Sequence, residues 1–188
     1  MTTSSPKTAL LLVDVINSFY EAGQPNYYPE VAATLPALAA LRDTARERDA
    51  LLVHSVERHY RGLEDFEFAK LPRHHQSGEH DADYFPGFEP VERANEIVVP
   101  KRRYSGFYAT DLDLVLREQG IGRVIVAGVK TNVCIRATVQ DAFAGGFEVV
   151  VPREATNSNR PHLAAASLED IERYFGSVVS LADALELL

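Results

Sequence analysis

The sequence predicts a single doubly wound α/β domain over residues 1–188, with a six-stranded, mostly parallel sheet and helices on both faces. Short apolar runs recur along the chain without polar alternation, which is typical of strands buried on both faces. Segments with helical spacing of apolar residues separate these runs. Strands that alternate with helices form parallel βαβ units, and their right-handed crossovers place helices on both faces of the sheet.

The expected strands are the apolar and β-branched runs. The first is continuously apolar and ends at Asp14, so it suits a strand in the middle of a parallel sheet. In chain order the six expected strands cover residues 9–13, 50–55, 96–99, 124–128, 147–151 and 177–179.

The expected helices lie between these strands and are bounded by residues that begin or end helices. Asp111 stands near a helix start, Gly120 and the pair Gly145–Gly146 follow helix ends, and Pro161 suits a first helical turn. The expected helices cover residues 31–48, 111–119, 134–144 and about 159–174, with a last one from residue 182.

The segment Glu57–Val91 interrupts the alternation. It is long, rich in charged, His, Pro and aromatic residues, and lacks clear periodicity. Long irregular connections in compact domains tend to be functional loops or subunit contacts. We therefore expect this segment to cover a site or to form a subunit interface.

Composition narrows the class of protein. The chain has 19 Lys+Arg against 27 Asp+Glu, a formal net charge of −8, which argues against sequence-independent binding of nucleic acid. One cysteine cannot form an internal disulfide or a Cys-rich zinc site. No apolar run approaches the roughly 20 residues of a membrane span, and residues 1–6 do not resemble a signal peptide. These features predict a cytoplasmic protein that binds neither membrane nor nucleic acid.

Three residues of reactive types follow different expected strands. Ligands of open α/β sheets bind outside the carboxyl ends of the strands. Asp14 follows the first strand, Lys101 follows the third, and Cys134, the sole cysteine, follows the fourth. We therefore expect an acid, an ammonium group and a thiol to meet at one edge of the sheet.

These three groups suit nucleophilic catalysis. Cys134 stands where a helix should begin, and the partial positive charge of a helix N-terminus together with the Lys101 ammonium should favour its thiolate. Backbone N–H groups at such a turn can bind an oxyanion. Asp14 is suited to act as the general base. Together they form the parts of a cysteine amidase.

Three segments resemble the isochorismatase-like cysteine hydrolases. Residues 128–134 (Gly-Val-Lys-Thr-Asn-Val-Cys) resemble the family signature Gly-Val-x-Thr-x-x-Cys. Residues 11–19 resemble the family's strand with its catalytic Asp, and residues 99–107 resemble its lysine segment. The resemblance covers nearly the whole chain and is strongest to the ureidoacrylate, N-carbamoylsarcosine and biuret amidohydrolases, with nicotinamidases more distant.

The resemblance implies a catalytic triad of Cys134, Asp14 and Lys101 and a sheet ordered 3-2-1-4-5-6. It also implies a cis peptide bond between Val129 and Lys130, and an oxyanion site made by the backbone N–H groups of Lys130 and Cys134. Isochorismatases proper, which cleave a vinyl ether, lack the nucleophilic cysteine, so Cys134 favours the amidase branch. The resemblance further implies that catalysis needs no cofactor.

Substrate contacts are expected near the triad. Arg102 and Arg103 are candidates for pairing with a substrate carboxylate, because guanidinium binds carboxylate in a bidentate way. The Lys130 side chain adjoins the expected oxyanion loop, but the sequence assigns it no role. The aromatic candidates for the pocket wall are Phe19, Tyr104, Phe107 and Tyr108.

A metal site is the main alternative feature. Nicotinamidases carry an Asp-x-His motif and a second His after the second strand. This chain has Glu57 and His59 at a similar place, followed by His74, His75 and His80. Because Glu replaces Asp and the spacing to the later histidines has no match, we expect no metal.

The sequence thus predicts a cysteine-dependent amidohydrolase that cleaves a small amide or ureido C–N bond through a covalent acyl-enzyme and releases ammonia. A metal-assisted, nicotinamidase-like deamidase and a non-catalytic scaffold with the same fold stay open as alternatives. The apolar last helix and the aromatic-rich segment Glu57–Val91 suggest a homo-oligomer, a dimer or tetramer by resemblance.

Overall fold

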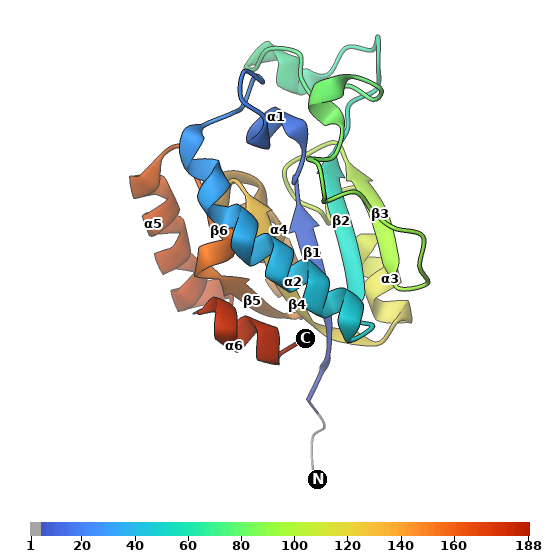
Figure 1. Cartoon of the computed structure of the whole chain (residues 1–188), viewed down its shortest axis with the longest axis vertical. Helices are drawn as coiled ribbons and strands as arrows, with labels where there is room; N and C mark the ends of the chain where they lie inside the picture. The colour runs from blue at the N-terminus through green and yellow to red at the C-terminus, as the bar shows by residue number, and fades with distance from the viewer. Residues whose placement is uncertain (1–4) are drawn as a thin grey trace.

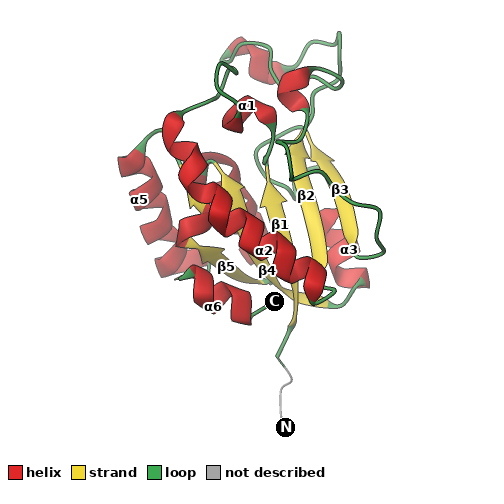
Figure 2. Cartoon of the chain, viewed as in Figure 1, coloured by secondary structure: helices red, strands yellow, loops and turns green. Residues whose placement is uncertain are grey.

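The computed structural model describes residues 5–188. Residues 1–4 lie outside the described residues, and so does most of the segment 1–6, which is not expected to be a signal peptide. A parallel sheet lies between two layers of helices (Figures 1 and 2). The strands are β1 (Lys7–Val13), β2 (Leu51–Glu57), β3 (Glu96–Lys101), β4 (Ile121–Val129), β5 (Glu148–Pro152), β6 (Thr156–Asn157) and β7 (Ser177–Val179).

The strand order confirms the prediction. The main path runs β3-β2-β1-β4-β5-β7, and all its neighbouring pairs are parallel. The predicted sixth strand is β7. Between β5 and β7 the two-residue β6 pairs with the end of β4, and the sequence analysis missed it because two residues carry no periodicity.

Strand β1 shows why its apolar run does not alternate with polar residues. Leu10 and Leu12 belong to the apolar core on one side of the sheet, whereas Leu11 and Val13 belong to the core on the other side. Successive side chains of a strand point to opposite faces, so a central strand covered on both sides must be apolar at every position.

The helices of the two layers cover these two cores. Helices α2 (Leu35–Glu47) and α6 (Leu181–Glu186) pack on the Leu10 side, and α3 (Leu112–Glu118) and α4 (Arg136–Ala144) pack on the Leu11 side. The remaining helices and turns are α1 (Asn17–Tyr20), the 3₁₀ turns η1 (Pro29–Thr34), η2 (Phe66–Ala69), η3 (His80–Ala82) and η5 (Arg153–Ala155), the π turns η4 (Thr131–Ile135) and η6 (Ile171–Phe175), and helix α5 (Pro161–Asp170).

Two predicted helices begin differently in the structure. The segment expected as one helix over 31–48 is a 3₁₀ turn followed by α2, and Pro36 lies in the first turn of α2. Proline has no N–H to donate, so it is tolerated only in that turn. The helix expected from Cys134 starts as the π turn η4, which places Cys134 inside the turn rather than at its first residue.

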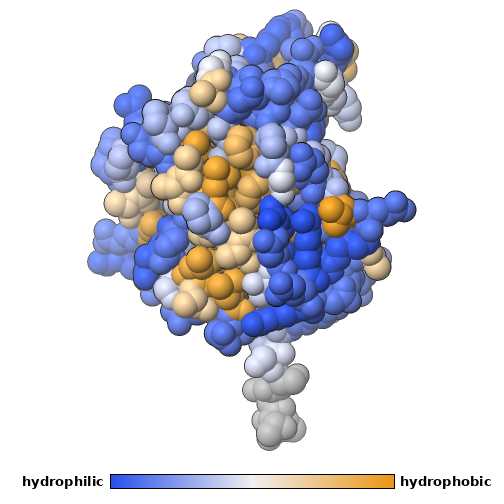
Figure 3. All heavy atoms as spheres, viewed as in Figure 1, coloured by the Kyte–Doolittle hydropathy of each residue, from blue (hydrophilic) through white to orange (hydrophobic). Residues whose placement is uncertain are grey.

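The irregular segment after β2 lies above the carboxyl ends of β1 and β2, at the top of Figure 1. Its chain folds back on itself through a bridge between His59 and Gln76, and Tyr84 bridges to Ile16. Figure 3 shows that this top region is mostly hydrophilic, whereas apolar side chains gather lower on the same face. Within residues 5–188, no helix has the length and apolar character that crossing a membrane requires.

Candidate active site

The carboxyl ends of three strands bring Asp14, Lys101 and Cys134 together. Asp14 follows β1, Lys101 is the last residue of β3, and Cys134 lies in the turn after β4. Lys101 Nζ donates to Asp14 Oδ2 at 2.8 Å and lies 3.7 Å from Cys134 Sγ. Lys101 and Asp14 are fully buried, and Cys134 is 3% exposed. A buried ammonium group therefore joins a carboxylate and a thiol.

Backbone groups hold the Asp14 carboxylate from its other side. The N–H of Glu57 donates to Asp14 Oδ1 at 2.7 Å. Asp14 has a φ of 55°, and its own N–H donates to the carbonyl of Ser55 at 3.0 Å. Each oxygen of the Asp14 carboxylate thus has a donor, which orients the group between β1 and β2.

The approach of β4 to β1 depends on a glycine. Gly128 has a φ of 121°, and a Cβ built on it would lie 2.0 Å from the carbonyl oxygen of Val13. Only glycine adopts this positive φ readily and has no Cβ to clash with Val13. The Val129–Lys130 peptide bond that follows is cis. The carbonyl of Lys130 accepts from the N–H groups of Val133 and Ile135 at 3.0 and 3.2 Å, which closes the turn around Cys134.

The protonation of the thiol differs from the expectation of a resting thiolate. Burial raises the pKa of Cys134 well above its usual value; the Lys101 ammonium lowers this pKa, and the Asp14 and Glu57 carboxylates raise it. Burial alone would lower the pKa of Lys101, but the Asp14 carboxylate, together with Cys134 and Glu57, outweighs burial and holds that pKa above its usual range. The resting site therefore contains a protonated thiol beside an ammonium–carboxylate pair.

A pocket of about 250 Å³ opens onto Cys134. Two predicted aromatic contacts, Phe19 and Tyr104, line it, as does Lys130. No sequence pattern indicates Asn26, Leu71 or Val133 as pocket residues, and the pattern of His74 and His75 indicates only possible metal ligands. The full lining is Phe19, Asn26, Glu57, Leu71, His74, His75, Tyr104, Lys130, Val133 and Cys134.

Two predicted aromatic contacts lie elsewhere, which corrects the sequence analysis. Phe107 packs in the apolar core on the α4 side, with its ring centroid 5.8 Å from that of Phe147. Tyr108 is 62% exposed and lines a separate hollow of about 650 Å³. The loop after β3 thus directs only Tyr104 toward Cys134.

The two predicted arginine contacts also lie outside the pocket, beside Tyr108. Arg102 and Arg103 both bind the buried carboxylate of Asp65, at 2.8 and 3.0 Å. Because both guanidinium groups pair with Asp65 and line the separate hollow, the prediction that they contact substrate is wrong in this structure.

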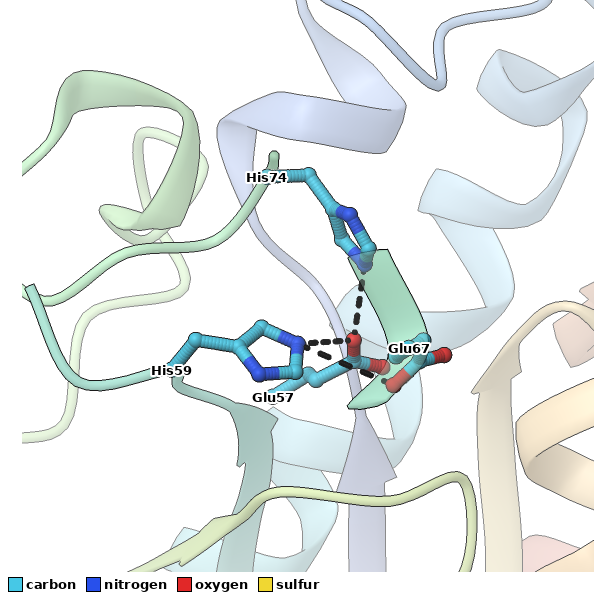
Figure 4. Close-up of side chains that lie close together, drawn as sticks. All are labelled: Glu57, His59, Glu67 and His74. Carbon is cyan, nitrogen blue, oxygen red and sulfur yellow. Dashed lines mark hydrogen bonds and ion pairs between the residues drawn. The ribbon is translucent and has the colours of Figure 1, made fainter. Parts of the chain in front are cut away.

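A second buried polar cluster borders the pocket. It consists of Glu57, His59, Glu67 and His74, whose possible ligand atoms lie within 4.8 Å of one another (Figure 4). Glu57 Oε1 lies 3.0 Å from His59 Nε2 and 3.1 Å from His74 Nε2. His80 does not belong to this cluster, because it is exposed and pairs with Glu21.

The donor set of this cluster fits a divalent cation. His59 Nδ1 lies 3.0 Å from Asp65 Oδ2, and His74 Nδ1 lies 2.6 Å from the carbonyl oxygen of Pro72. If each neutral ring carries its proton on Nδ1, the lone pair of its Nε2 points toward Glu57. The Glu57 carboxylate can only accept hydrogen bonds, so no hydrogen bond forms between these atoms. Both carboxylate oxygens of Glu67 are buried without a hydrogen-bond partner. A cation, or protons on both rings, would satisfy these groups; two imidazoles and two carboxylates are ligands that zinc accepts.

The sequence of this chain is similar to a known domain family and to two amidohydrolases. Residues 8–183 match the model of the isochorismatase domain. The chain is 33% identical over 187 residues to maleamate amidohydrolase of Pseudomonas putida, covering 97% of this chain and 87% of that one. It is 43% identical over 102 residues to ureidoacrylate amidohydrolase RutB of an Enterobacter species, covering 54% of this chain and 44% of that one.

The fold is similar to a solved structure as well. An isochorismatase-like hydrolase from Alkaliphilus metalliredigens superposes with a TM-score of 0.88 at 34% identity, covering 96% of this chain and 98% of that one. The likeness therefore covers nearly the whole length of both chains.

Proposed function

This chain belongs to the isochorismatase family, and within it we propose a cysteine-dependent amidohydrolase that cleaves a small amide or ureido C–N bond and releases ammonia. Its relatives identify it as a hydrolase of C–N bonds in small non-peptide amides. The observation that carries the cysteine mechanism is the Lys101 ammonium, which contacts both the Asp14 carboxylate and the Cys134 thiol beside a small pocket.

In the first half of the proposed reaction, Asp14 takes the thiol proton as Cys134 Sγ attacks the amide carbonyl. Lys101 stabilises the negative charge that appears on the sulfur. The backbone N–H groups of Lys130 and Cys134 bind the carbonyl oxygen as it becomes an oxyanion. The C–N bond then breaks, the nitrogen takes the proton from Asp14, and ammonia leaves a thioester on Cys134.

In the second half, water attacks the thioester carbonyl and gives a proton to Asp14. The C–S bond breaks, and the sulfur takes the proton from Asp14. The sum is amide plus water to acid plus ammonia, and both Asp14 and Cys134 return to their starting states. The raised pKa of Cys134 is consistent with this cycle, because its thiolate forms only when Asp14 removes the proton.

The names of the relatives guide the choice of substrates. Maleamate and ureidoacrylate are a small amide and a small ureido compound. A pocket of about 250 Å³ suits compounds of that size. Residues 1–188 form one domain in this proposal, and cytoplasmic location and a homo-oligomeric state stay predictions.

Ammonia release from small amides and ureido acids tests this proposal. We expect wild-type protein to release ammonia from at least one compound, and Cys134→Ala and Asp14→Asn to release none above background. Equal release by wild type and Cys134→Ala would exclude the cysteine mechanism. A wild type inactive on the whole panel would favour the scaffold alternative.

A second candidate function, metal-assisted deamidation, is favoured by the buried carboxylate of Glu67, which lies beside His59 and His74 and has no hydrogen-bond partner. Glu57, His59, Glu67 and His74 would hold the ion. A bound divalent ion supplies a Lewis acid that polarises or anchors a substrate atom in the pocket. Elemental analysis of purified protein checks this candidate: about one metal per chain that is lost in His59→Ala would support it, and no metal in either would exclude it.

A further inference from the structure

The Lys130 side chain is a second ammonium group at the Cys134 pocket, and the mechanism above uses only its backbone. Lys101, the other ammonium at the site, is neutralised by Asp14 at 2.8 Å and Glu57 at 3.5 Å. No carboxylate lies within ion-pair distance of Lys130 in the described part of the chain, residues 5–188. Its positive charge therefore remains available to a ligand in the pocket.

Two aromatic rings hold this ammonium in place. Lys130 Nζ lies 5.6 Å from the ring centroid of Phe19 and 5.5 Å from that of Tyr28. The hydroxyl of Tyr28 donates to Asn157 Oδ1 at 2.7 Å, which fixes the Tyr28 ring. Aromatic faces attract a cation without supplying an opposite charge, so the two rings position the Lys130 ammonium and leave it without a counter-ion.

The surroundings favour an anion at this place. Burial lowers the pKa of Lys130; negative charge on Cys134 would raise it, and the nearby Arg160 guanidinium lowers it. The net lowering means that little negative charge around Lys130 compensates the partly buried ammonium. A carboxylate bound beside Lys130 would replace lost hydration and offset the repulsion from Arg160.

We propose that Lys130 is a specificity residue that binds a carboxylate on the substrate, so that the substrates are small anionic amides or ureido acids. This inference rests on the proposed function, because it assigns the substrate class of the same pocket. A volume of about 250 Å³ corresponds to roughly eight waters at about 30 Å³ each, enough for a carboxylate and a carboxamide joined by a short carbon chain.

The kinetic test compares maleamate with maleamide, which replaces the carboxylate by a neutral carboxamide on the same skeleton. In Lys130→Met, we expect the ratio of kcat/KM for maleamate over maleamide to fall about 10- to 100-fold, mainly through KM for maleamate. Lys130→Arg should restore part of the ratio. Lys7→Met is the matched control, because Lys7 is exposed at the opposite end of β1, and its ratio should equal that of wild type. An unchanged ratio in Lys130→Met would overturn the inference.

A binding test separates this inference from the proposed function. Calorimetric titration with maleate measures carboxylate binding without any hydrolysis. We expect wild type and Lys7→Met to bind maleate at least tenfold more tightly than Lys130→Met. Should wild type hydrolyse neither amide, the proposed function fails for these compounds, and the maleate titration still decides the role of Lys130. Equal maleate affinity in wild type and Lys130→Met, or no binding to wild type, would overturn the inference.

Discussion

Two buried polar clusters lie next to each other at the carboxyl edge of the sheet, and they differ in charge balance. In the triad, the Lys101 ammonium pairs with the Asp14 carboxylate, and burial keeps the Cys134 thiol protonated. The neighbouring histidine–carboxylate cluster, Glu57, His59, Glu67 and His74, contains two carboxylates and no permanent cation. The carboxylate of the triad thus already has a cationic partner. The carboxylates of the histidine–carboxylate cluster need protons on the histidines or a bound metal ion to balance their charge.

Glu57 joins the two clusters. Its Oε2 lies 3.5 Å from Lys101 Nζ, and its Oε1 faces His59 and His74. Burial raises the pKa of Glu57, but Lys101 and the histidines outweigh burial and hold this pKa well below its usual value. Glu57 therefore remains ionised, and changes in either cluster can affect the other through it.

The largest expected difference concerns activity. Cys134→Ala should lower kcat/KM by about 10³-fold or more, because it removes the nucleophile. His59→Ala should lower it by less than about 10-fold if the triad alone performs the chemistry. Ammonia release measured on both variants checks this contrast. An equal loss of activity in the two variants would show that the histidine–carboxylate cluster is as important for activity as Cys134, which favours metal-assisted deamidation.

Removing the cation of the triad should cost the most stability. Lys101→Met leaves the buried carboxylates of Asp14 and Glu57 without their ammonium partner, so the free energy of unfolding should fall by about 3–5 kcal/mol. Urea denaturation followed by circular dichroism measures this loss. Lys7→Met, the same change at an exposed site, should stay within about 0.5 kcal/mol of wild type. A similar small change in Lys101→Met would mean that the buried pair does not form.

The pH dependence of thiol alkylation tests the charge state of Cys134. Because burial raises the pKa of Cys134, its thiolate is scarce at pH values up to the usual pKa of about 8.5. At pH 8, iodoacetamide should react with it at least about tenfold more slowly than with free cysteine, and the rate should still rise above pH 9. Cys134→Ala gives the background. A rate that levels off below pH 8 would contradict the protonated resting thiol.

The smallest expected effect lies beside the histidine–carboxylate cluster. Asp65 accepts from His59, Arg102 and Arg103, and although burial raises its pKa, these donors hold the pKa below its usual value. Asp65→Asn should therefore lower the free energy of unfolding by about 1–2 kcal/mol at pH 7. A depressed pKa stabilises the fold above the unfolded value of 3.8, and this contribution is lost as pH falls below it.

Thermal melts of wild type and Asp65→Asn across pH 2–7 check this last effect. The gap between their melting temperatures should be widest near pH 7 and close as pH falls below about 4. A gap that stays constant at all pH values would show that the ionised carboxylate is not what matters at this position.

The sequence determined the parts of this protein that depend on local pattern. Unbroken apolar runs identified the longer strands, because a strand covered on both faces must be apolar at every position. The rule that parallel strands carry their sites at their carboxyl ends then selected Asp14, Lys101 and Cys134. The structure brings these three side chains into contact.

Tertiary structure decided what depends on segments meeting in space. Which loop residues face the pocket follows from the packing of the chain, so Phe107 turned inward to the core while Asn26 and His75 joined the pocket. The charge state of Cys134 also followed from burial, which a sequence does not display. The position of Lys130 near the rings of Phe19 and Tyr28 also depends on tertiary structure, because both rings lie more than 100 residues away in the chain.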